Sequence, residues 1–265
     1  MEDFEKSIKF LLRKKFVFIP LTHANYFLSN SIKRKHRYVV CTFDDGYSNI
    51  SDTIPLLEKY HIPATFFINT AYLDGNAVKW TDIANFIDSA DNPSSIPENI
   101  KESIQKLKKP DETIDYEALR RNVEKSYSAF KTERSLYIAF KELFAIKNPL
   151  FTIGLHGHEH IHHSLMTPDW CKQNIIENLK ILKEHPNFIP FLSFPFGSYT
   201  DIEAEYFEKM GFRTLRCNGL LNYINNIPLN RSEIDGKVIS FRLMIKLAGE
   251  SFSFKKLIKT NVKKL

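Results

Sequence analysis

Two short apolar segments on either side of a helical pattern constrain the fold of this chain more than any other feature. Residues 38–43 form a β-rich apolar run, and residues 64–68 form a second one. The segment 51–60 between them has helical spacing and ends shortly before Pro63. A strand, a helix and a second strand within about thirty residues predict a βαβ unit, and therefore a parallel sheet.

The same alternation continues along most of the chain. Before the βαβ unit we expect a helix over residues 2–16 and a strand over 16–20. After residue 149 the pattern predicts three strands and two helices, the strands over 150–155, 190–194 and 212–217 and the helices over 168–184 and 201–210. Alternating strands and helices indicate an α/β fold, either a (β/α) barrel or an open sheet.

Residues 76–148 interrupt this alternation with a charged, mostly helical pattern. We interpret them as a helical insertion in one domain that covers residues 1–265, rather than as a second domain. The composition agrees with this interpretation, because 43% hydrophobic and 26% charged residues are typical of a globular chain that buries one core.

The net charge of +6 is concentrated in the last fourteen residues, 252–265, which hold five lysines and no acid. The rest of the chain is close to neutral, so we expect no nucleic-acid partner. Apolar residues recur in this basic tail at helical spacing. The pattern favours either a last helix that docks on the barrel or a basic amphipathic helix at an anionic membrane surface.

The cysteines and the apolar runs indicate a compartment. Cys41, Cys171 and Cys217 are far apart, which predicts free thiols rather than disulfides or a thiolate zinc site. The longest uninterrupted apolar run, residues 16–21, is far too short to span a membrane, and the first residues lack a signal-peptide pattern. We expect a cytoplasmic protein, peripheral at the inner membrane face if the tail binds lipid.

Two adjacent carboxylates, Asp44 and Asp45, follow the strand predicted over residues 38–43. Such a pair is costly unless a positive group lies near it, and a metal ion would supply that charge. Neighbouring side chains of an extended segment point apart, so one carboxylate could bind a metal while the other faces a substrate. Gly46 allows a sharp turn there. The alternative is a turn in which an aspartate caps the next helix.

Five of the nine histidines fall within residues 156–163. Neutral imidazoles beside a carboxylate suit zinc or a similar divalent ion. His156 and His160 are four residues apart and would lie on one face of a helical turn. The pairs His158/His162 and His156/His158 stay open as alternatives, as does a solvated loop that binds no metal.

A third segment, SFPFGSY at residues 193–199, ends another predicted strand. Aromatic rings at a strand end could stack on a sugar, and the alternative is a hydrophobic plug followed by a turn. The substrate-binding residues expected here are Phe194, Pro195, Phe196, Gly197 and Tyr199.

Together the three segments resemble the polysaccharide deacetylase family, which is also called the NodB homology domain or carbohydrate esterase family 4. TFDDG at residues 42–46 matches the first motif of the family, and His156 and His160 match its H-[ST]-x-x-H motif with Gly157 in place of Ser or Thr. SFPFG at residues 193–197 resembles the third motif. The resemblance covers residues 4 to 231 approximately, and it implies a deformed (β/α) barrel that removes the N-acetyl group from an amino sugar.

The resemblance also implies residue roles. Asp44 would be the general base, and Asp45, His156 and His160 would hold a divalent metal. Zinc is the first expectation, while cobalt, nickel, manganese or iron could occupy the same ligands. Such a metal polarises the amide carbonyl and lowers the pKa of water from 15.7 to about 7.

The sequence departs from the family in two places. No histidine follows His185, so the late motif that supplies the general acid of the family is absent, and the third motif lacks its arginine. Arg231 could orient Asp44 or bind substrate, and His158 could protonate the leaving amine, unless Asp44 returns its proton. Two alternatives therefore stay open: another carbohydrate amidase or esterase, such as a deformylase or O-deacetylase, and a non-catalytic glycan-binding relative. The expected substrate is an N-acetylated glycan or a lipid-linked precursor of a surface polysaccharide.

Overall fold

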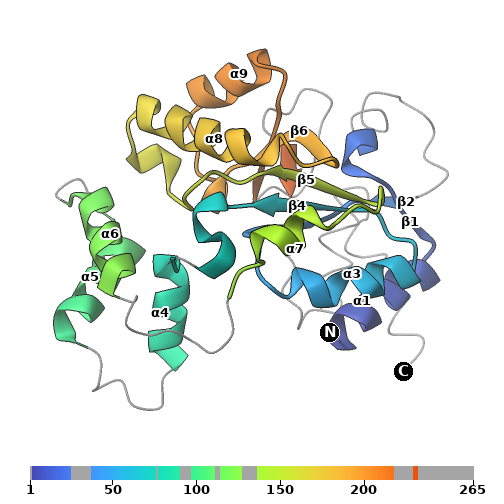
Figure 1. Ribbon diagram of the computed structural model, residues 1–265, viewed down its shortest axis with the longest axis horizontal. Coiled ribbons are helices and arrows are strands. Elements are labelled where there is room, and N and C mark those ends of the chain that lie inside the picture. Colours follow the sequence, from blue (N-terminus) through green and yellow to red (C-terminus); the bar gives the residue numbers. More distant parts are fainter. Residues whose placement is uncertain are drawn as a thin grey trace, which may run out of the picture.

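The computed structural model of this chain describes residues 2–24, 37–75, 77–89, 97–110, 114–126, 136–217 and 229–231 (Figure 1). The basic tail, the side chain of Cys217 and the side chain of Arg231 lie outside the described part of the chain. The predictions made for them therefore stay predictions.

A parallel six-stranded sheet forms the centre of the molecule. Its strands neighbour one another in chain order, and each neighbouring pair runs parallel. They are β3 (Cys41–Phe43), β4 (Ala64–Ile68), β5 (Phe151–Leu155), β6 (Phe188–Ser193), β7 (Arg213–Cys217) and β8 (Leu229–Arg231). A parallel sheet whose spatial order follows the chain order is the arrangement of a (β/α) barrel, so the predicted fold class is confirmed.

The prediction of one strand over residues 38–43 is wrong. The segment forms two strands, β2 (Arg37–Val39) and β3, which pair with different partners. β2 pairs with β1 (Phe16–Phe18), whereas β3 pairs with β4. The chain changes from one ladder to the other at Val40, and an apolar pattern alone cannot show which neighbour each residue will pair with.

Helices flank the sheet on both sides (Figure 1). α8 (Pro168–Leu182) and α9 (Asp201–Lys209) lie on one side, and α1 (Glu2–Arg13), α3 (Ile50–Lys59) and α7 (Phe140–Phe144) lie on the other. All five residues of β4 are buried because both faces of the sheet are covered. This explains why its sequence is a continuous apolar run rather than an alternating one.

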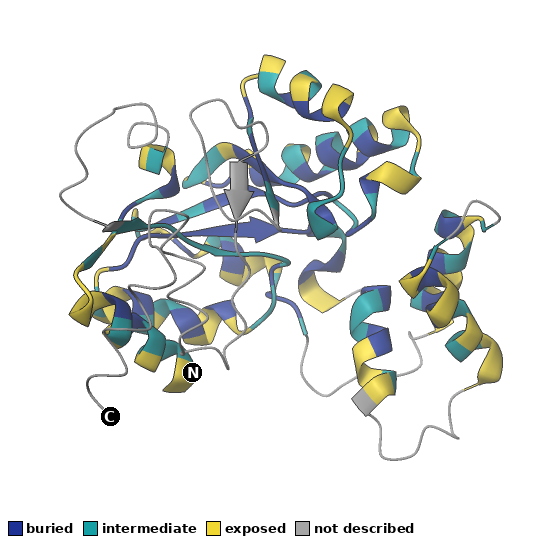
Figure 2. Ribbon diagram, turned by 180° about the vertical axis from the view of Figure 1, so that it is seen from behind, coloured by how far each residue is buried: buried dark blue, intermediate teal, exposed yellow. Residues whose placement is uncertain are grey.

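The helical insertion forms a smaller unit beside the sheet (Figure 2). Its helices are α4 (Trp80–Ser89), α5 (Glu98–Lys108) and α6 (Tyr116–Ser126). They pack around an apolar cluster of their own that includes Trp80, Leu107 and Val123. Phe196 and Met166 of the main body pack against the same cluster, so the insertion contacts the sheet domain through side chains. Whether the whole chain is one domain stays a prediction.

Gly154, in the middle of β5, packs directly beneath an aromatic ring. A Cβ atom at this position would lie 2.5 Å from Cε1 of Phe67. We expect Gly154→Ala to lower the free energy of unfolding by about 1–3 kcal/mol, because the buried ring of Phe67 must move. Urea titration followed by circular dichroism measures the change.

Gly211→Ala is the matched control for that substitution. A Cβ atom there meets no atom within 4 Å, although the φ angle of +91° makes the backbone unfavourable for alanine. Gly211→Ala therefore measures the backbone cost without a clash. If Gly154→Ala left the free energy of unfolding unchanged, the close packing of Phe67 on β5 would be contradicted.

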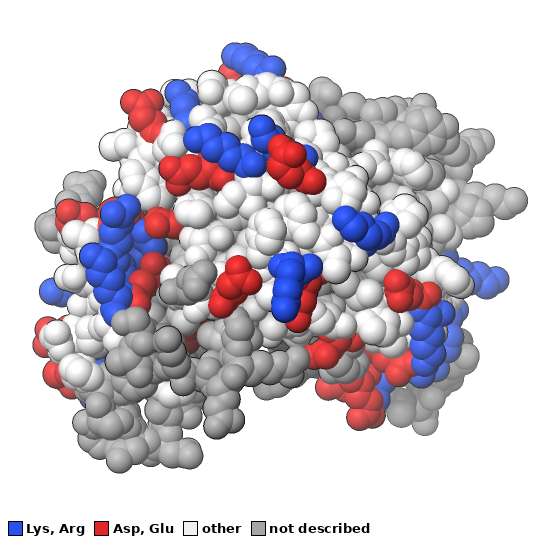
Figure 3. Space-filling view, viewed as in Figure 1, with Lys and Arg blue, Asp and Glu red and all other residues white. Residues whose placement is uncertain are grey.

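The charged side chains on the face shown in Figure 3 are of both signs and are interspersed. No helix within the described ranges is long and apolar enough to cross a membrane.

Candidate metal centre and active site

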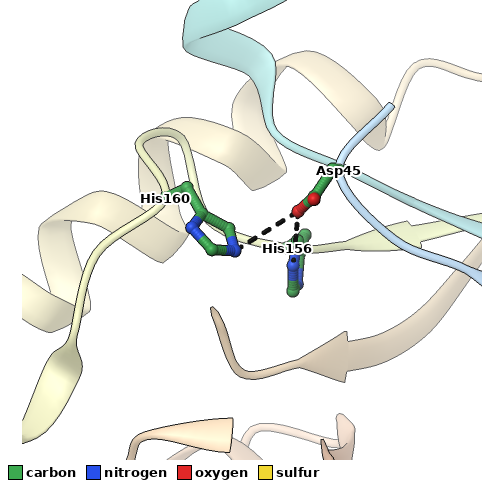
Figure 4. A group of neighbouring side chains, drawn as sticks. All are labelled: Asp45, His156 and His160. Carbon is green, nitrogen blue, oxygen red and sulfur yellow. Dashed lines mark ion pairs between the residues drawn. The ribbon is translucent and has the colours of Figure 1, made fainter. Parts of the chain in front are cut away.

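Three side chains converge where β3 and β5 end (Figure 4). Asp45 follows β3, and His156 and His160 follow β5. The Oδ1 atom of Asp45 lies 3.2 Å from Nε2 of His156 and 3.3 Å from Nε2 of His160. These are the residues that the sequence predicted as metal ligands, and the structure brings all three together.

One hydrogen bond orients the His156 ring beside Asp45, whereas Nδ1 of His160 has no hydrogen-bond partner among the described residues. Nδ1 of His156 lies 2.7 Å from the carbonyl oxygen of Ser193, to which it donates, so Nε2 carries no hydrogen. Among the described residues, Oδ1 of Asp45 is buried without a hydrogen-bond partner. A buried carboxylate oxygen beside the Nε2 atoms of two imidazoles is a position that suits a cation.

The spacing of the donors fits a metal ion. Bonds of about 2.0–2.1 Å at a tetrahedral angle separate two donors by about 3.3 Å, which is the distance seen here. One carboxylate and two neutral imidazoles are a donor set that suits zinc and related divalent ions. The residues present therefore fit a divalent metal, with room for further ligands.

The protonation states of the three groups suit this role. Burial raises the pKa of Asp45, but His160, His156 and Lys79 outweigh it and hold that pKa well below its usual value of 3.8. Burial lowers the pKa of His160 well below 6.5, although Asp45 opposes the shift. The two shifts favour an ionised carboxylate and a neutral His160 ring, which are the forms that bind a metal.

The turn after β3 positions the two carboxylates. Asp45 and Gly46 both adopt positive φ angles, of 78° and 79°. Residues with positive φ reverse the chain within a short distance, and Asp tolerates this conformation better than most residues. The alternative of a helix cap does not apply, because α3 has Asn49 at its N-cap and no side chain bonds the helix there.

Asp44 lies beside the metal centre in a different environment. Its Oδ2 atom accepts a hydrogen bond of 3.2 Å from the hydroxyl of Ser193 and lies 3.8 Å from Nε2 of His156. Ser193 thus contacts both Asp44 and, through its carbonyl, His156. The two adjacent aspartates therefore have different neighbours, since Asp45 lies between the two histidines and Asp44 lies beside Ser193.

Three buried asparagines hold the backbone of the histidine segment. Asn178 on α8 accepts a hydrogen bond of 3.0 Å from the His156 N–H. Asn174, one turn earlier, accepts one of 2.7 Å from the Glu159 N–H. Asn69, just after β4, donates to the carbonyl oxygens of His156 and Gly157. The loop is therefore rigid without regular secondary structure, which is what a fixed ligand geometry needs.

A family model described as polysaccharide deacetylase matches residues 31–113. Over these residues the chain is similar to the polysaccharide deacetylases. The match contains the Asp44–Asp45 turn, and the histidine segment lies beyond its end. The members of this family are hydrolases that remove acetyl groups from carbohydrates. No curated protein matches the sequence.

Solved structures extend the likeness to most of the chain. A deacetylase from Streptococcus pyogenes, PplD in complex with acetate, is 15% identical with a TM-score of 0.57, and the alignment covers 88% of this chain and 79% of that one. IcaB from Ammonifex degensii is 16% identical with a TM-score of 0.57, covering 88% and 83%. A de-N-acetylase from Aggregatibacter actinomycetemcomitans is 14% identical with a TM-score of 0.58, covering 90% and 86%. At these identities the comparison establishes the fold.

Gly157, where the chain departs from the second motif of the family that it resembles, has a local explanation. Its φ angle is +81°, and a Cβ atom there would lie 2.7 Å from Nδ2 of Asn174. A serine or threonine would strain the backbone and displace the asparagine that holds Glu159. The glycine is thus coupled to Asn174 in this chain.

The remaining predicted site residues fall into three groups. His158 lies outside the ligand group, with Nδ1 2.9 Å from the Thr70 hydroxyl. Phe194 is fully buried in the core and Pro195 is also buried, so their side chains do not face solvent, whereas Phe196, Gly197 and Tyr199 are partly exposed. The backbone of Arg231 pairs with β7, and nothing is described of its side chain.

A second buried group, His163, Cys171 and Glu203, also brings metal-binding atom types together. Here hydrogen bonds account for the proximity. His163 donates through Nδ1 to the Glu203 carboxylate, and the Cys171 thiol lies 3.4 Å from the His163 carbonyl oxygen. This group ties the histidine segment to α8 and α9.

Sequence reasoning missed the residues of the helical insertion that contact the centre. Nζ of Lys79 lies 2.8 Å from Oδ2 of Asp45. A nitrogen of Arg120, on α6, lies 2.5 Å from Oε2 of Glu159, a residue between His156 and His160 in the sequence. The side chains of both cations are buried, with exposed fractions of 1% and 0%. In the sequence, the charges of the insertion do not indicate these buried contacts, because a charged helical segment usually faces solvent.

The Arg120–Glu159 ion pair yields a prediction for metal binding. We expect Glu159→Ala to weaken metal binding about tenfold, because the ion pair holds the loop between His156 and His160. Arg120 keeps Glu117 and Glu124 as partners, so the insertion itself should stay folded. Competition with a chelating dye measures the affinity. Glu177→Ala, at a partly exposed position of α8, is the control. Equal affinities in the two variants would show that the ion pair does not support the loop.

Proposed function

We propose that this protein is a metal-dependent hydrolase that removes the N-acetyl group from an amino sugar in a polysaccharide or glycan precursor. The observation that carries the proposal is the convergence of Asp45, His156 and His160 on one point, with the Asp44 carboxylate beside them. The family relationship supports a carbohydrate deacetylase, and the amide bond is our choice among the acetyl groups that such enzymes remove.

Asp45, His156 and His160 would hold the metal, with zinc as the first candidate and cobalt, nickel, manganese or iron as substitutes. When bound, the metal would polarise the acetyl carbonyl and make water acidic enough to be deprotonated near neutral pH. Asp44 is the base that accepts the proton of the attacking water. The Ser193 hydroxyl donates to Oδ2 of Asp44 and so orients the carboxylate.

The leaving amine needs a proton, and the chain offers two sources. His158 is oriented by a hydrogen-bond chain in which Asn178 donates to Thr70 over 3.0 Å and Thr70 contacts Nδ1 of His158. If Thr70 donates to Nδ1, the hydrogen of the neutral ring lies on Nε2. Asp44 is the other source, since it carries the proton that it has just accepted. We also propose that Arg231 binds the substrate. A wall on which the sugar stacks would be formed by Phe196, Gly197 and Tyr199.

Acetate release tests the function. Protein depleted of metal and then reloaded with one equivalent of zinc is incubated with N-acetylglucosamine oligomers, and acetate is measured enzymatically. We expect release that requires the metal and produces free amines in equal amount. Failure of the reloaded protein to release acetate from any N-acetylated glycan would contradict the proposal.

A second candidate function is favoured by one observation. No histidine follows His185, so the residue that protonates an amine leaving group in related enzymes has no counterpart at that place. An alcohol leaving group has less need of such an acid, which would suit an O-deacetylase. Parallel assays with O-acetylated and N-formylated sugars separate these reactions, because the preferred substrate shows the highest kcat/KM.

The cellular location is also a proposal. We propose that the protein acts in the cytoplasm on a lipid-linked glycan precursor, with the basic tail at the inner membrane face. The helical spacing of the apolar residues in 252–265 and the five lysines between them support this. Co-sedimentation with anionic vesicles should decrease when residues 252–265 are removed, and unchanged binding would contradict the membrane contact.

A further inference from the structure

A buried lysine lies directly behind the metal centre. Lys79 precedes α4 at the start of the helical insertion, and 1% of its side chain is exposed. Its Nζ atom is 2.8 Å from Oδ2 of Asp45 and 2.9 Å from the Tyr47 hydroxyl. A charged group is buried only where other groups replace its hydration, so these contacts determine where the ammonium can lie.

The surroundings of the ammonium fix it from several directions. Its third polar neighbour is Oδ2 of Asp82, at 3.6 Å, and the Tyr47 ring lies beneath it with the centroid 4.2 Å away. Asp82 in turn accepts hydrogen bonds from the hydroxyls of Tyr47 and Tyr137. An ammonium has three N–H donors, and three oxygens surround this one. Lys79 therefore has no freedom to turn away from Asp45.

The two oxygens of Asp45 consequently have different partners. Oδ1 faces the Nε2 atoms of His156 and His160, whereas Oδ2 contacts Lys79. A carboxylate can bind a metal through one oxygen or through both. With Oδ2 held by an ammonium, only Oδ1 is available.

We propose that Lys79 is a positioning residue that restricts Asp45 to binding the metal through one oxygen. The inference rests on the proposed function, because it assigns Lys79 to the same site. A one-oxygen ligand leaves more open positions for water and substrate than a two-oxygen ligand does. The charge of Lys79 also draws electron density from the carboxylate, so Asp45 neutralises less of the charge of the metal.

This role predicts an unusual combination of effects. Lys79→Met frees Oδ2 and removes a positive charge beside a cation, so metal affinity should stay the same or increase. The coordination number should rise, because both oxygens of Asp45 can now bind. We expect kcat to fall about 10- to 100-fold with little change in KM. A residue that merely supported the fold would weaken metal binding and lower the unfolding temperature together.

The experiment compares wild type, Lys79→Met and Lys108→Met, each loaded with cobalt(II). Lys108 is the matched control, because it also belongs to the insertion and forms a 2.8 Å ion pair, with Asp88, at a more exposed place. Visible absorption reports coordination, since cobalt absorbs more weakly as its coordination number rises. Titration against a chelator gives the affinity, and acetate release gives kcat. If Lys79→Met does not fold, Lys79→Gln replaces it, with the same changes expected in smaller size.

The outcomes separate this inference from the proposed function. A weaker cobalt absorption, an undiminished affinity and a lower kcat in Lys79→Met alone would support the positioning role. A spectrum and kcat equal to those of wild type, or a loss of metal, would overturn it. Wild type that binds cobalt but releases no acetate would contradict the proposed function, and the absorption spectra would still decide the role of Lys79. Wild type that binds no metal would overturn both.

Discussion

Replacing Asp45 by asparagine is expected to abolish metal binding and acetate release together. The substitution keeps the shape of the side chain and removes the one negative charge that lies between His156 and His160. We expect metal affinity to fall by at least about 10²-fold and kcat/KM by about 10³-fold, which corresponds to about 4 kcal/mol of transition-state stabilisation. Metal content after dialysis and acetate release from the same sample are the measurements.

The variants must distinguish a loss of metal binding and catalysis from a loss of the folded structure. Asp45→Asn leaves the buried ammonium of Lys79 with Asp82 alone as a countercharge, and breaking such a pair destabilises a protein by about 3–5 kcal/mol. His160→Gln is the second variant, because it removes a ligand without disturbing Lys79. Asp88→Asn, at an exposed ion pair of the insertion, is the control. Full activity with no bound metal in either ligand variant would refute the assignment of the centre.

Replacing Asp44 by asparagine should give the opposite combination: metal retained and turnover lost. Asp44 contacts the Ser193 hydroxyl and lies 3.8 Å from His156, but it is not among the three converging ligands. Loss of a general base lowers the rate by about 10²–10⁴-fold, so we expect kcat to fall within that range while metal affinity changes less than about threefold. The measurements are zinc content, chelator competition and steady-state kinetics.

The comparison with Ser193→Ala sharpens this test. Alanine removes the hydroxyl that donates to Asp44 but keeps the backbone carbonyl that accepts from His156. A smaller decrease in kcat than in Asp44→Asn, with metal binding intact, is expected if the hydroxyl only orients the base. If Asp44→Asn lost its metal as Asp45→Asn does, Asp44 would be a ligand and the division of roles between the two aspartates would be wrong.

Local patterns in the sequence predicted the elements that build the site. The apolar run at β4 and the helical spacing of α8 and α9 are signals within one segment, and the structure confirms them within a few residues. Asp45, His156 and His160 were singled out by the resemblance to the polysaccharide deacetylase motifs, because the histidine cluster alone left the pairs His158/His162 and His156/His158 open. The parallel sheet then brought the ends of β3 and β5 to the same edge.

Contacts between distant segments could not be predicted in this way. The division of residues 38–43 between β2 and β3 depends on which strand each half meets. Lys79 and Arg120 look like ordinary surface charges in sequence, and only the packing of the insertion against the sheet domain buries them. Asn69 directly follows β4, and its bonds to the carbonyl oxygens after β5 join residues that lie far apart in the chain.

Through Lys79 and Arg120 the helical insertion supports both Asp45 and the histidine segment. Shortening residues 76–148 to a simple loop would remove the countercharges of both Asp45 and Glu159. A relative that lacks the insertion must therefore supply another donor to the second oxygen of its aspartate, or accept a ligand that binds through both oxygens. Insertion and active-site chemistry should change together among relatives, so grafting the bare barrel from this chain would not transfer its catalytic centre intact.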